Sequence, residues 1–557
     1  MPEIIRDHLL TCLVFLPLIG AVVLMFMPKP AESPADGHGT HQDSSSPADP
    51  RAQAIRWMAL LFSLLTFALS LILLFRFHSA KSSYQFVDGP YNWIKQFHVH
   101  YYLGIDGISL LLILLTTFLS VLCIGYSFSV KQRVKEFMIF MLVLETGMLG
   151  VFCALDLVLF YVFWESMLIP MYFLIGIWGH ERRIYAAIKF FIFTFIGSVL
   201  MLVAIVALYV KTGSFNLVTL LTPGTQPHHL LSLISPHVLM WMFAAFALAF
   251  MIKVPMFPFH TWLPDAHVEA PTAGSVILAG VLLKMGIYGF LRFCLPLFPA
   301  QAHQAAPLFL TLAVIGIVYG AIVAAMQPDM KKVVAYSSVS HLGFVMLGIF
   351  SLNPLGITGA VLQSINHGVS TGALFFIVGM FYDRKHTRLI SAYGGVKRAV
   401  PILAAFFLIA MLSSIALPLT NGFVGEFTIL QGSFISHTAG WKYTAVATTG
   451  MILSAVYMLW MFQRVMYGPL DKEDNRSLPD LVWREKLVLA PLVVLIFWFG
   501  CYVTTWTKPL IPTVDSLVSN VGPASIAERR ASAASILEGT AGKFAIIPLT
   551  RGKLGGK

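Results

Sequence analysis

The stretch Phe250-Met-Ile-Lys253-Val-Pro255-Met-Phe-Pro258-Phe-His260 places a lysine and two prolines inside a long apolar run. Proline lacks a backbone N–H and clashes with the preceding helical turn, so Pro255 predicts a broken helix. A charged side chain at bilayer depth costs at least ~2.5–3.5 kcal/mol on insertion scales, and it usually marks an ion path or a proton relay. Lys253 beside a helix break therefore indicates a polar path through a membrane.

The composition extends this interpretation to the whole chain. Of 557 residues, 57% are hydrophobic and only 11% are charged, and the mean hydropathy is +0.79. Apolar runs of about 18 or more residues recur, each long enough to span the hydrocarbon core. The runs are continuous and do not alternate, which excludes a β-barrel. We predict an all-α polytopic membrane protein with about fourteen transmembrane helices, at 10–27, 57–77, 106–129, 134–152, 155–176, 185–210, 236–254, 271–294, 306–326, 331–350, 355–381, 401–432, 442–467 and 486–506.

The net charge of +11 follows the topology and does not indicate a nucleic-acid partner. Basic residues crowd one set of alternate loops and are rare in the other. By the positive-inside rule the first set is cytoplasmic, which places both termini on the outer side. The first set is Lys29, Arg51, Arg56, Lys131, Arg133, Lys135, Arg182, Arg183, Lys331, Lys332, Arg384, Lys385, Arg388, Lys397, Arg398, Lys472, Arg476, Arg484 and Lys486; the second is Lys81, Lys95, Lys211 and Lys442.

A second break, at Pro418, follows the break at Pro255 five spans later. Interrupted helices at matching places in two halves are typical of inverted-repeat transporters. We therefore predict two inverted five-helix repeats, 134–294 and 306–467. The other segments are the N-terminal helices of 1–105, a third helix in 106–133, and the last transmembrane helix with a polar tail in 468–557.

The N-terminal region contains two unusual segments. Residues 30–56 form a polar, turn-rich cytoplasmic loop. Its His38 and His41 could bind a metal, but the composition of the loop favours a disordered insertion. Residues 78–105 are rich in aromatic side chains and predict a segment at the outer membrane interface.

The ionisable side chains embedded in the apolar stretches of predicted spans include Glu145, Lys253, Lys284 and Glu426. A desolvated lysine loses and regains a proton more readily than an exposed one. A pair such as Glu145 with Lys253 would act as a switch, because separating the partners would release the lysine's proton. The alternative is a structural ion pair, although such pairs are often replaceable by apolar residues without loss of stability.

Histidines extend the polar path. Ser337 and His341 lie one turn apart, and a stripe at i, i+4, i+7 and i+8 places Gln363, His367, Ser370 and Thr371 on one helix face. Polar stripes on two successive helices favour a hydrated channel over hydrogen-bonded packing. Glu426, after the Pro418 break, would then be the outlet carboxylate.

Other ionisable residues near the ends of spans allow several interpretations. Asp265, His267 and Glu269 lie close to the cytoplasmic break, where they fit either proton uptake or capping of the 271–294 span. Asp156 and Glu165 are nine residues apart, about 180° around a helix, so we expect them not to share one site.

Four basic residues near span ends are expected to have ordinary membrane roles. Lys331 and Lys332 are interpreted as topological anchors, and Arg292 and Arg464 as side chains that reach to the interface. The five cysteines are far apart, and no iron–sulfur, zinc or nucleotide-binding motif is present, so we expect no metal and no redox cofactor in this chain.

Several long motifs resemble the antiporter-like membrane subunits of respiratory complex I, the NADH:quinone oxidoreductase. They are the stretches from His260 to Ser275, from Lys332 to His341 and from Asp156 to Tyr172, and Gly425-Glu-Phe. The resemblance covers roughly residues 100–470. Within the family it is closest to the M-type branch, where a glutamate such as Glu426 ends the charge row and the L- and N-type chains more often have lysine.

The resemblance implies proton translocation coupled to quinone reduction elsewhere in the complex, in a bacterial inner membrane. It implies a charge row of Glu145, Lys253, Lys284, His341, His367 and Glu426. It places NADH, FMN, iron–sulfur clusters and quinone in partner subunits, and it makes the other membrane-arm chains, especially the L- and N-type ones, the partners. The 31–50 loop and the 510–557 tail depart from the family pattern.

Three alternatives stay open at this point. The chain could belong to a multisubunit cation/proton antiporter or to a membrane-bound hydrogenase-type complex, which share these helices. It could also be a scaffold without conduction, but a scaffold has no use for so many costly charges inside the membrane.

Overall fold

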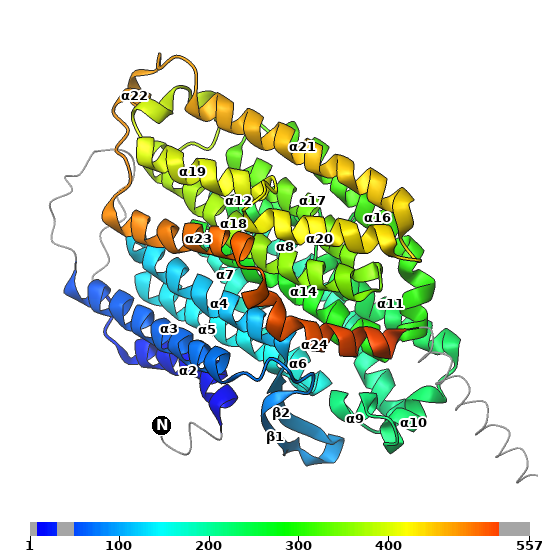
Figure 1. The fold of residues 1–557 in the computed structure, drawn as a ribbon. Helices are drawn as coiled ribbons and strands as arrows, with labels where there is room; N and C mark the ends of the chain where they lie inside the picture. The colour runs from blue at the N-terminus through cyan, green and yellow to red at the C-terminus, as the bar shows by residue number, and fades with distance from the viewer. Residues whose placement is uncertain (1–7, 31–48, 523–557) are drawn as a thin grey trace, which may run out of the picture.

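The computed structural model describes residues 8–30 and 49–522, and these form one bundle of helices (Figure 1). Twelve of its helical segments are long and apolar enough to cross a membrane. They are α2 (Leu9–Phe26), α3 (Pro50–Arg76), α4 (Gly107–Tyr126) with the turn that follows it, α5 (Val134–Cys153), α6 (Leu157–Ser166) with α7 (Leu168–Trp178), α8 (Arg183–Thr212), α11 (Pro236–Lys253), the span Thr272–Leu297, α16 (Pro299–Ala325), α17 (Met330–Phe350), α18 (Pro354–Lys385) and α21 (Gly440–Met466).

The two remaining predicted spans are also present. The predicted span 401–432 is a broken pair, α19 (Pro401–Ser414) and α20 (Asn421–Ile435), and the span 486–506 is α23 (Trp483–Cys501). After α23 the chain bends by 65° into α24 (Thr504–Val521), which lies in the tail predicted to be polar. The all-α polytopic fold is therefore confirmed, with a helical counterpart for each of the fourteen predicted spans.

Both predicted helix breaks are observed. α11 ends at Lys253, and the chain passes through Pro255 before α12 (Trp262–Glu269) begins. The break leaves carbonyl groups without intrahelical donors, and the indole N–H of Trp262 donates to the carbonyl of Ile252 at 2.9 Å. Pro418 lies in the corresponding gap between α19 and α20.

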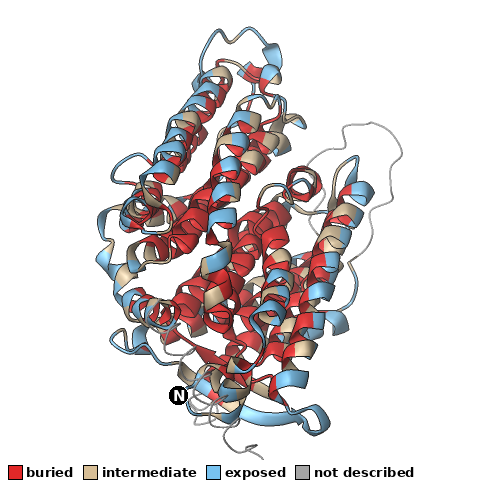
Figure 2. Cartoon of the chain, turned by 90° about the vertical axis from the view of Figure 1, so that its right-hand side faces the viewer, coloured by how far each residue is buried: buried red, intermediate tan, exposed pale blue. Residues whose placement is uncertain are grey.

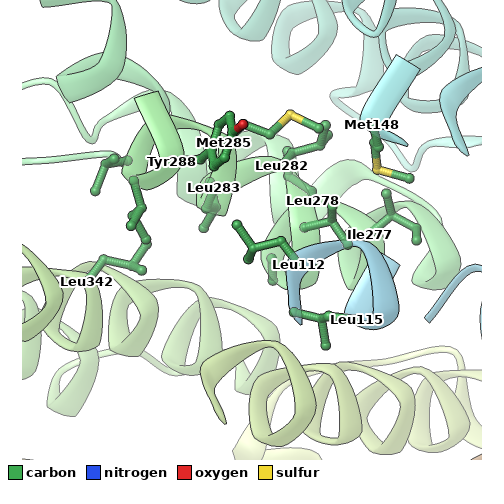
Figure 3. Packing of buried hydrophobic residues seen from close by; sticks show 14 of the residues in the cluster. Leu112, Leu115, Met148, Ile277, Leu278, Leu282, Leu283, Met285, Tyr288 and Leu342 are labelled. Atoms are coloured by element: carbon green, nitrogen blue, oxygen red, sulfur yellow. The ribbon is translucent and has the colours of Figure 1, made fainter. Parts of the chain in front are cut away.

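The span Thr272–Leu297 is irregular throughout its length. α13 (Thr272–Ile277) is followed by a π-helical turn at Leu278–Leu282, α14 (Leu283–Gly289), a second π-helical turn at Phe290–Cys294 and α15 (Leu295–Leu297). Around the first π-helical turn, Leu112 and Leu115 of α4 and Met148 of α5 pack close to Ile277 and Leu278 (Figure 3). Dense apolar packing thus surrounds the place where this span departs from α-helical geometry.

The predicted interfacial segment is a β-hairpin, which we did not expect. Strands β1 (Gln85–Ile94) and β2 (Val99–Ile105) pair antiparallel, with irregular register between them. Aromatic and β-branched residues favour strands, so the composition that indicated an interface also suits a hairpin. The short helices α9 (Leu217–Leu221) and α10 (Gln226–Ser232) lie at the same end of the bundle (Figure 1), which we call the hairpin end. The short α22 (Glu473–Arg476) lies at the opposite end.

Burial is concentrated at the centre of the bundle, and exposed positions lie along its outside (Figure 2). The most apolar window is fully buried in only two spans, Thr272–Leu297 and α18, whereas that of α3 is 28% buried. Polar side chains within these two windows therefore face protein. The predictions for His38, His41, the rest of the 31–48 loop and the tail beyond 522 lie outside the described residues, as do both termini.

Candidate functional site: a buried row of ionisable side chains

Lys284 lies near the centre of the bundle, in α14 between the two π-helical turns. Its ammonium group donates a hydrogen bond to the carbonyl of Ala279 and lies 2.7 Å from Nδ1 of His367 in α18. Single π-helical turns often occur at functional sites. The contact joins the two most deeply buried spans, one from each predicted repeat.

The row continues from His367 to Glu426. The rings of His367 and His341 lie 5.9 Å apart between centroids. Nδ1 of His341 is 2.7 Å from Oε1 of Glu426, and the amide of Gln363 donates to the same carboxylate oxygen at 2.9 Å. Since the break at Pro418 starts α20 beside α18, Glu426 meets groups from α17 and α18. The structure thus brings together Lys284, His367, His341 and Glu426.

Many of these side chains have hydrogen-bonding capacity left over. Almost all buried polar atoms in proteins have a partner, either protein or ordered water. Among the described residues, unpartnered buried atoms include Nζ of Lys253, Oε2 of Glu145, Oε1 of Glu165, both ring nitrogens of His267, Nε2 of His367, Oε1 of Gln363 and Oε2 of Glu426. Such free capacity is what a proton relay through side chains and water requires.

Lys253 is buried at the last position of α11, and the carboxylate whose charge acts on it is not the expected Glu145. Its ammonium lies over the rings of Trp164 and Phe190, 5.3 and 5.7 Å from their centroids. The carboxylate whose charge acts on it is Glu165 of α6. Tyr161 and Ser198 are polar neighbours of Glu165.

Glu145 does not pair with Lys253, so this part of the sequence interpretation is wrong. Its carboxyl is fully buried, and its hydrogen-bond donor among the described residues is the hydroxyl of Ser63 in α3, at 3.4 Å. Its charge also acts on the thiol of Cys123 in α4. Glu145 thus faces α3 and α4, outside the predicted repeat, and Lys253 lies elsewhere.

A signal in the sequence pointed to Glu165. The side chain of Asp156 caps α6 by accepting from the backbone N–H groups of Val158 and Leu159, at 2.9 and 3.3 Å. A helix-starting aspartate is a common cap. Glu165 lies nine residues after Asp156, on the opposite side of α6, and takes no part in capping the helix. Its carboxylate is therefore free to act on Lys253.

Asp265, His267 and Glu269 do not form one cluster. Asp265 pairs with Lys189 of α8 at 2.6 Å and its side chain is 34% exposed. His267 is buried, with its ring stacked on Phe375 of α18 at 4.7 Å. Glu269 accepts from the backbone N–H of Arg182 at 2.9 Å, so it caps α8 and not the Thr272–Leu297 span. Only His267 points toward the row.

Two basic residues have roles that the sequence did not suggest. Lys331 is buried, and its ammonium donates to two carbonyl groups at the end of α12. They are those of Val268 in the last turn, at 3.3 Å, and of Ala270 just after it, at 2.6 Å. Arg292 does not extend to the interface, since it is only 8% exposed and pairs with Asp106 at 2.7 Å. Arg464, in contrast, lies over the ring of Trp460, 3.8 Å from its centroid.

The arrangement is chemically suited to moving protons. A chain of lysine, histidine and carboxylate can pass a proton between atoms within hydrogen-bond distance or through one water. Among residues 8–30 and 49–522, no group of three or more His, Cys, Asp or Glu side chains is placed to hold a metal ion.

Comparison with known proteins identifies the family. Residues 154–462 match the family model described as NADH:quinone oxidoreductase/Mrp antiporter, TM. The chain is 47% identical to NADH-quinone oxidoreductase subunit M of Rhodobacter capsulatus over 92% of this chain and 97% of that one.

Solved structures agree in fold. A chain of respiratory complex I from Thermus thermophilus, solved with bound NADH, is 30% identical with a TM-score of 0.78, over 92% of this chain and all of that one. A chain of the Mrp complex from Dietzia sp. DQ12-45-1b, 19% identical with a TM-score of 0.74 over 93% and 99% of the two chains, shares the fold. This chain belongs to the NADH:quinone oxidoreductase/Mrp antiporter family of membrane subunits, in the branch of subunit M.

Proposed function

We propose that this chain translocates protons as a membrane subunit of an NADH:quinone oxidoreductase. The observation that carries the proposal is the run of contacts from Lys284 through His367 and His341 to Glu426, buried in a multi-pass membrane protein. Relatives named subunit M support the assignment to this complex over the antiporter and hydrogenase-type alternatives, since the Mrp chain shares 19% identity against 47%.

The second half of the row would pass a proton as follows. Charged Lys284 donates to Nδ1 of His367 across 2.7 Å, which leaves a neutral amine and an imidazolium. The proton then crosses from His367 to His341, whose ring centroids lie 5.9 Å apart, through one intervening water that the proposal requires. Nδ1 of His341 delivers it to Oε1 of Glu426, the outlet carboxylate.

In the first half, Lys253 and Glu165 would form the switch that the sequence suggested for Lys253 and Glu145. A neighbouring carboxylate favours the charged lysine, and movement of that carboxylate away favours its neutral form. The helix break at Pro255 gives Lys253 a joint at which it can move, and Pro418 does the same for Glu426. Glu145 keeps a place in the proposal as a separate proton-holding group beside Ser63.

Proton uptake would occur at the end opposite the hairpin end, where the basic loops gather. His267 is the inner member of this uptake site, since its ring lies against α18 near His367. Asp265 is its exposed member, and Glu269 supports the local backbone. In this proposal, the hairpin end and both termini would lie on the outer side of a bacterial inner membrane.

The chain would work inside a larger assembly. Its partners would be the other membrane-arm subunits, with L- and N-type antiporter-like chains as neighbours. NADH oxidation and quinone reduction, with FMN and iron–sulfur clusters, would belong to partner subunits, and this chain would respond by changes in ion pairing. The ranges 134–294 and 306–467 would be the two inverted repeats.

The test uses the whole complex reconstituted into lipid vesicles. We expect Lys284→Met and Glu426→Gln to abolish NADH-driven proton uptake while quinone reduction continues with an uncoupler present. Lys442→Met, at an exposed position, serves as the control. Normal pumping by both variants would overturn the proposed path.

A further inference from the structure

A second buried polar network lies at the hairpin end of the same span that carries Lys284. Its centre is Arg292, in the π-helical turn Phe290–Cys294. Eight residues separate Arg292 from Lys284, about 12 Å along a helix axis. A proton leaving Lys284 toward the hairpin end would therefore meet this network first.

All the polar bonds of Arg292 are made to buried or half-buried groups. Its guanidinium pairs with Asp106 at 2.7 Å and donates to the hydroxyls of Tyr288 and Tyr84 at 3.0 Å and of Ser109 at 3.2 Å. The tyrosine rings also lie against the guanidinium, each 5.1 Å from it to the centroid. The cation is thus paired, hydrogen-bonded and covered.

The network also ties together segments far apart in the chain. The second carboxylate oxygen of Asp106 accepts from the N–H groups of Ile108 and Ser109 at the start of α4. Tyr288 donates to the carbonyl of Phe152 in α5 at 3.1 Å. Thr513 of α24 accepts from the N–H of Gly107 at 3.1 Å.

This network differs from the charge row in its free hydrogen-bonding capacity. In the described part of the chain the row contains several buried atoms without partners, whereas none of the side-chain atoms of Arg292, Asp106, Ser109, Tyr84 or Tyr288 is among them. A guanidinium stays protonated in proteins, so it cannot relay a proton. A fixed cation lining a narrow path also repels protons, as in pores that exclude them.

We propose that the Arg292–Asp106 network is a seal that prevents protons from returning passively from the hairpin end to Lys284. The inference rests on the proposed function, because it assumes that Lys284 carries protons. It also assigns a direction: protons leave at the Glu426 end of the row and not along the Lys284 span.

The test measures passive proton movement without NADH. The purified complex is reconstituted into vesicles that contain a pH-sensitive dye, with potassium and valinomycin to remove the membrane potential, and the outside is acidified. We expect Arg292→Gln to raise the rate of internal acidification several-fold, while quinone reduction with an uncoupler stays at the wild-type rate. Lys442→Met, which removes an exposed cation outside the network, should leave the rate near that of the wild type.

Two further variants make the result decisive. Lys284→Met added to Arg292→Gln should suppress the leak, because the leak would pass through Lys284. Arg292→Lys keeps a cation but cannot reach all four partners, so it should also leak, and it replaces Arg292→Gln if that variant fails to assemble. A wild-type leak rate in an assembled Arg292 variant would overturn the seal, as would a leak that Lys284→Met does not reduce. Loss of pumping in Lys284→Met alone tests the proposed function separately.

Discussion

The ammonium group of Lys253 is buried and has no hydrogen-bond acceptor among the described residues. It lies over the aromatic rings of Trp164 and Phe190. A buried charge without compensation costs several kcal/mol, so this lysine depends on whatever carboxylate is near it. Glu165 is that carboxylate, and Glu145 is not. In the proposed mechanism, the first switch would therefore join α6 to the break after α11.

Replacing each carboxyl separately distinguishes the two glutamates. We expect Glu165→Gln to reduce NADH-driven proton pumping at least about tenfold, which corresponds to roughly 1.4 kcal/mol in the barrier, because Lys253 loses its counter-charge. Glu145→Gln should reduce pumping less, since glutamine keeps the hydrogen bond from Ser63. Pumping is measured in inside-out vesicles and normalised to quinone reductase activity. A larger loss in Glu145→Gln than in Glu165→Gln would show that the switch has been placed on the wrong residue.

The sequence predicted the individual members of the row better than their contacts. Lys284, His367, His341 and Glu426 were all identified as interior groups, because an ionisable residue inside an apolar run has no other location. Their contacts depend on which helices pack together, and spacing along one helix does not reveal this. The mistaken pairing of Glu145 with Lys253 arose for that reason: both are interior, but α5 presents Glu145 to α3.

At the scale of elements, the two proline breaks were predictable and the supports around them were not. Pro255 and Pro418 end helices for local steric reasons. The short helix α12 is held from outside, because Lys331 and Arg388 both donate to the carbonyl of Val268, at 3.3 and 2.7 Å. Its position at a cytoplasmic helix start predicts that Lys331 is an anchor, yet its side chain is buried and turned onto α12.

Removing this support should destabilise the complex. Lys331→Met removes the 2.6 Å hydrogen bond to the carbonyl of Ala270, which then keeps only the 3.4 Å bond from Ser275, while Val268 keeps its bond from Arg388. A hydrogen bond to a charged group contributes about 1.5–3 kcal/mol. We expect faster thermal inactivation and a lower unfolding temperature of the purified complex. Lys332→Met removes the same group one residue away at a half-buried position and should be close to neutral. Equal stability of the two variants would contradict a specific role for Lys331.

His180, in the connection between α7 and α8, should make the stability of the complex depend on pH. Burial, with the nearby charges of Lys331 and Arg388, lowers the pKa of His180 from 6.5 to about 4. Between these two values the unfolded chain binds a proton that the folded chain does not, so stability falls as the pH falls from about 6.5 to about 4. We expect the thermal inactivation rate of the complex to rise over this interval, and less steeply in His180→Gln. Parallel pH profiles for the two proteins would refute this assignment.

At the scale of the whole molecule, the row follows the buried centre of the bundle. Lys284 and His367 come from the two spans whose apolar windows are completely buried, and their contact joins 134–294 to 306–467. A proton path through this contact is enclosed by protein on all sides, with access needed only at its ends. Which end faces the cytoplasm then decides the direction of transport.

Cysteine labelling tests that orientation. The exposed residues Lys397 and Gln96 lie at opposite ends of the bundle, Lys397 in a basic loop and Gln96 in the turn of the hairpin. In a background that replaces the exposed Cys501 and the half-buried Cys12 with serine, a membrane-impermeant maleimide should label Lys397→Cys only in inside-out vesicles. Gln96→Cys should react only in right-side-out vesicles, and the background chain in neither. The reverse pattern would place the basic loops outside, and the Arg292 network would then lie on the side from which protons are taken up.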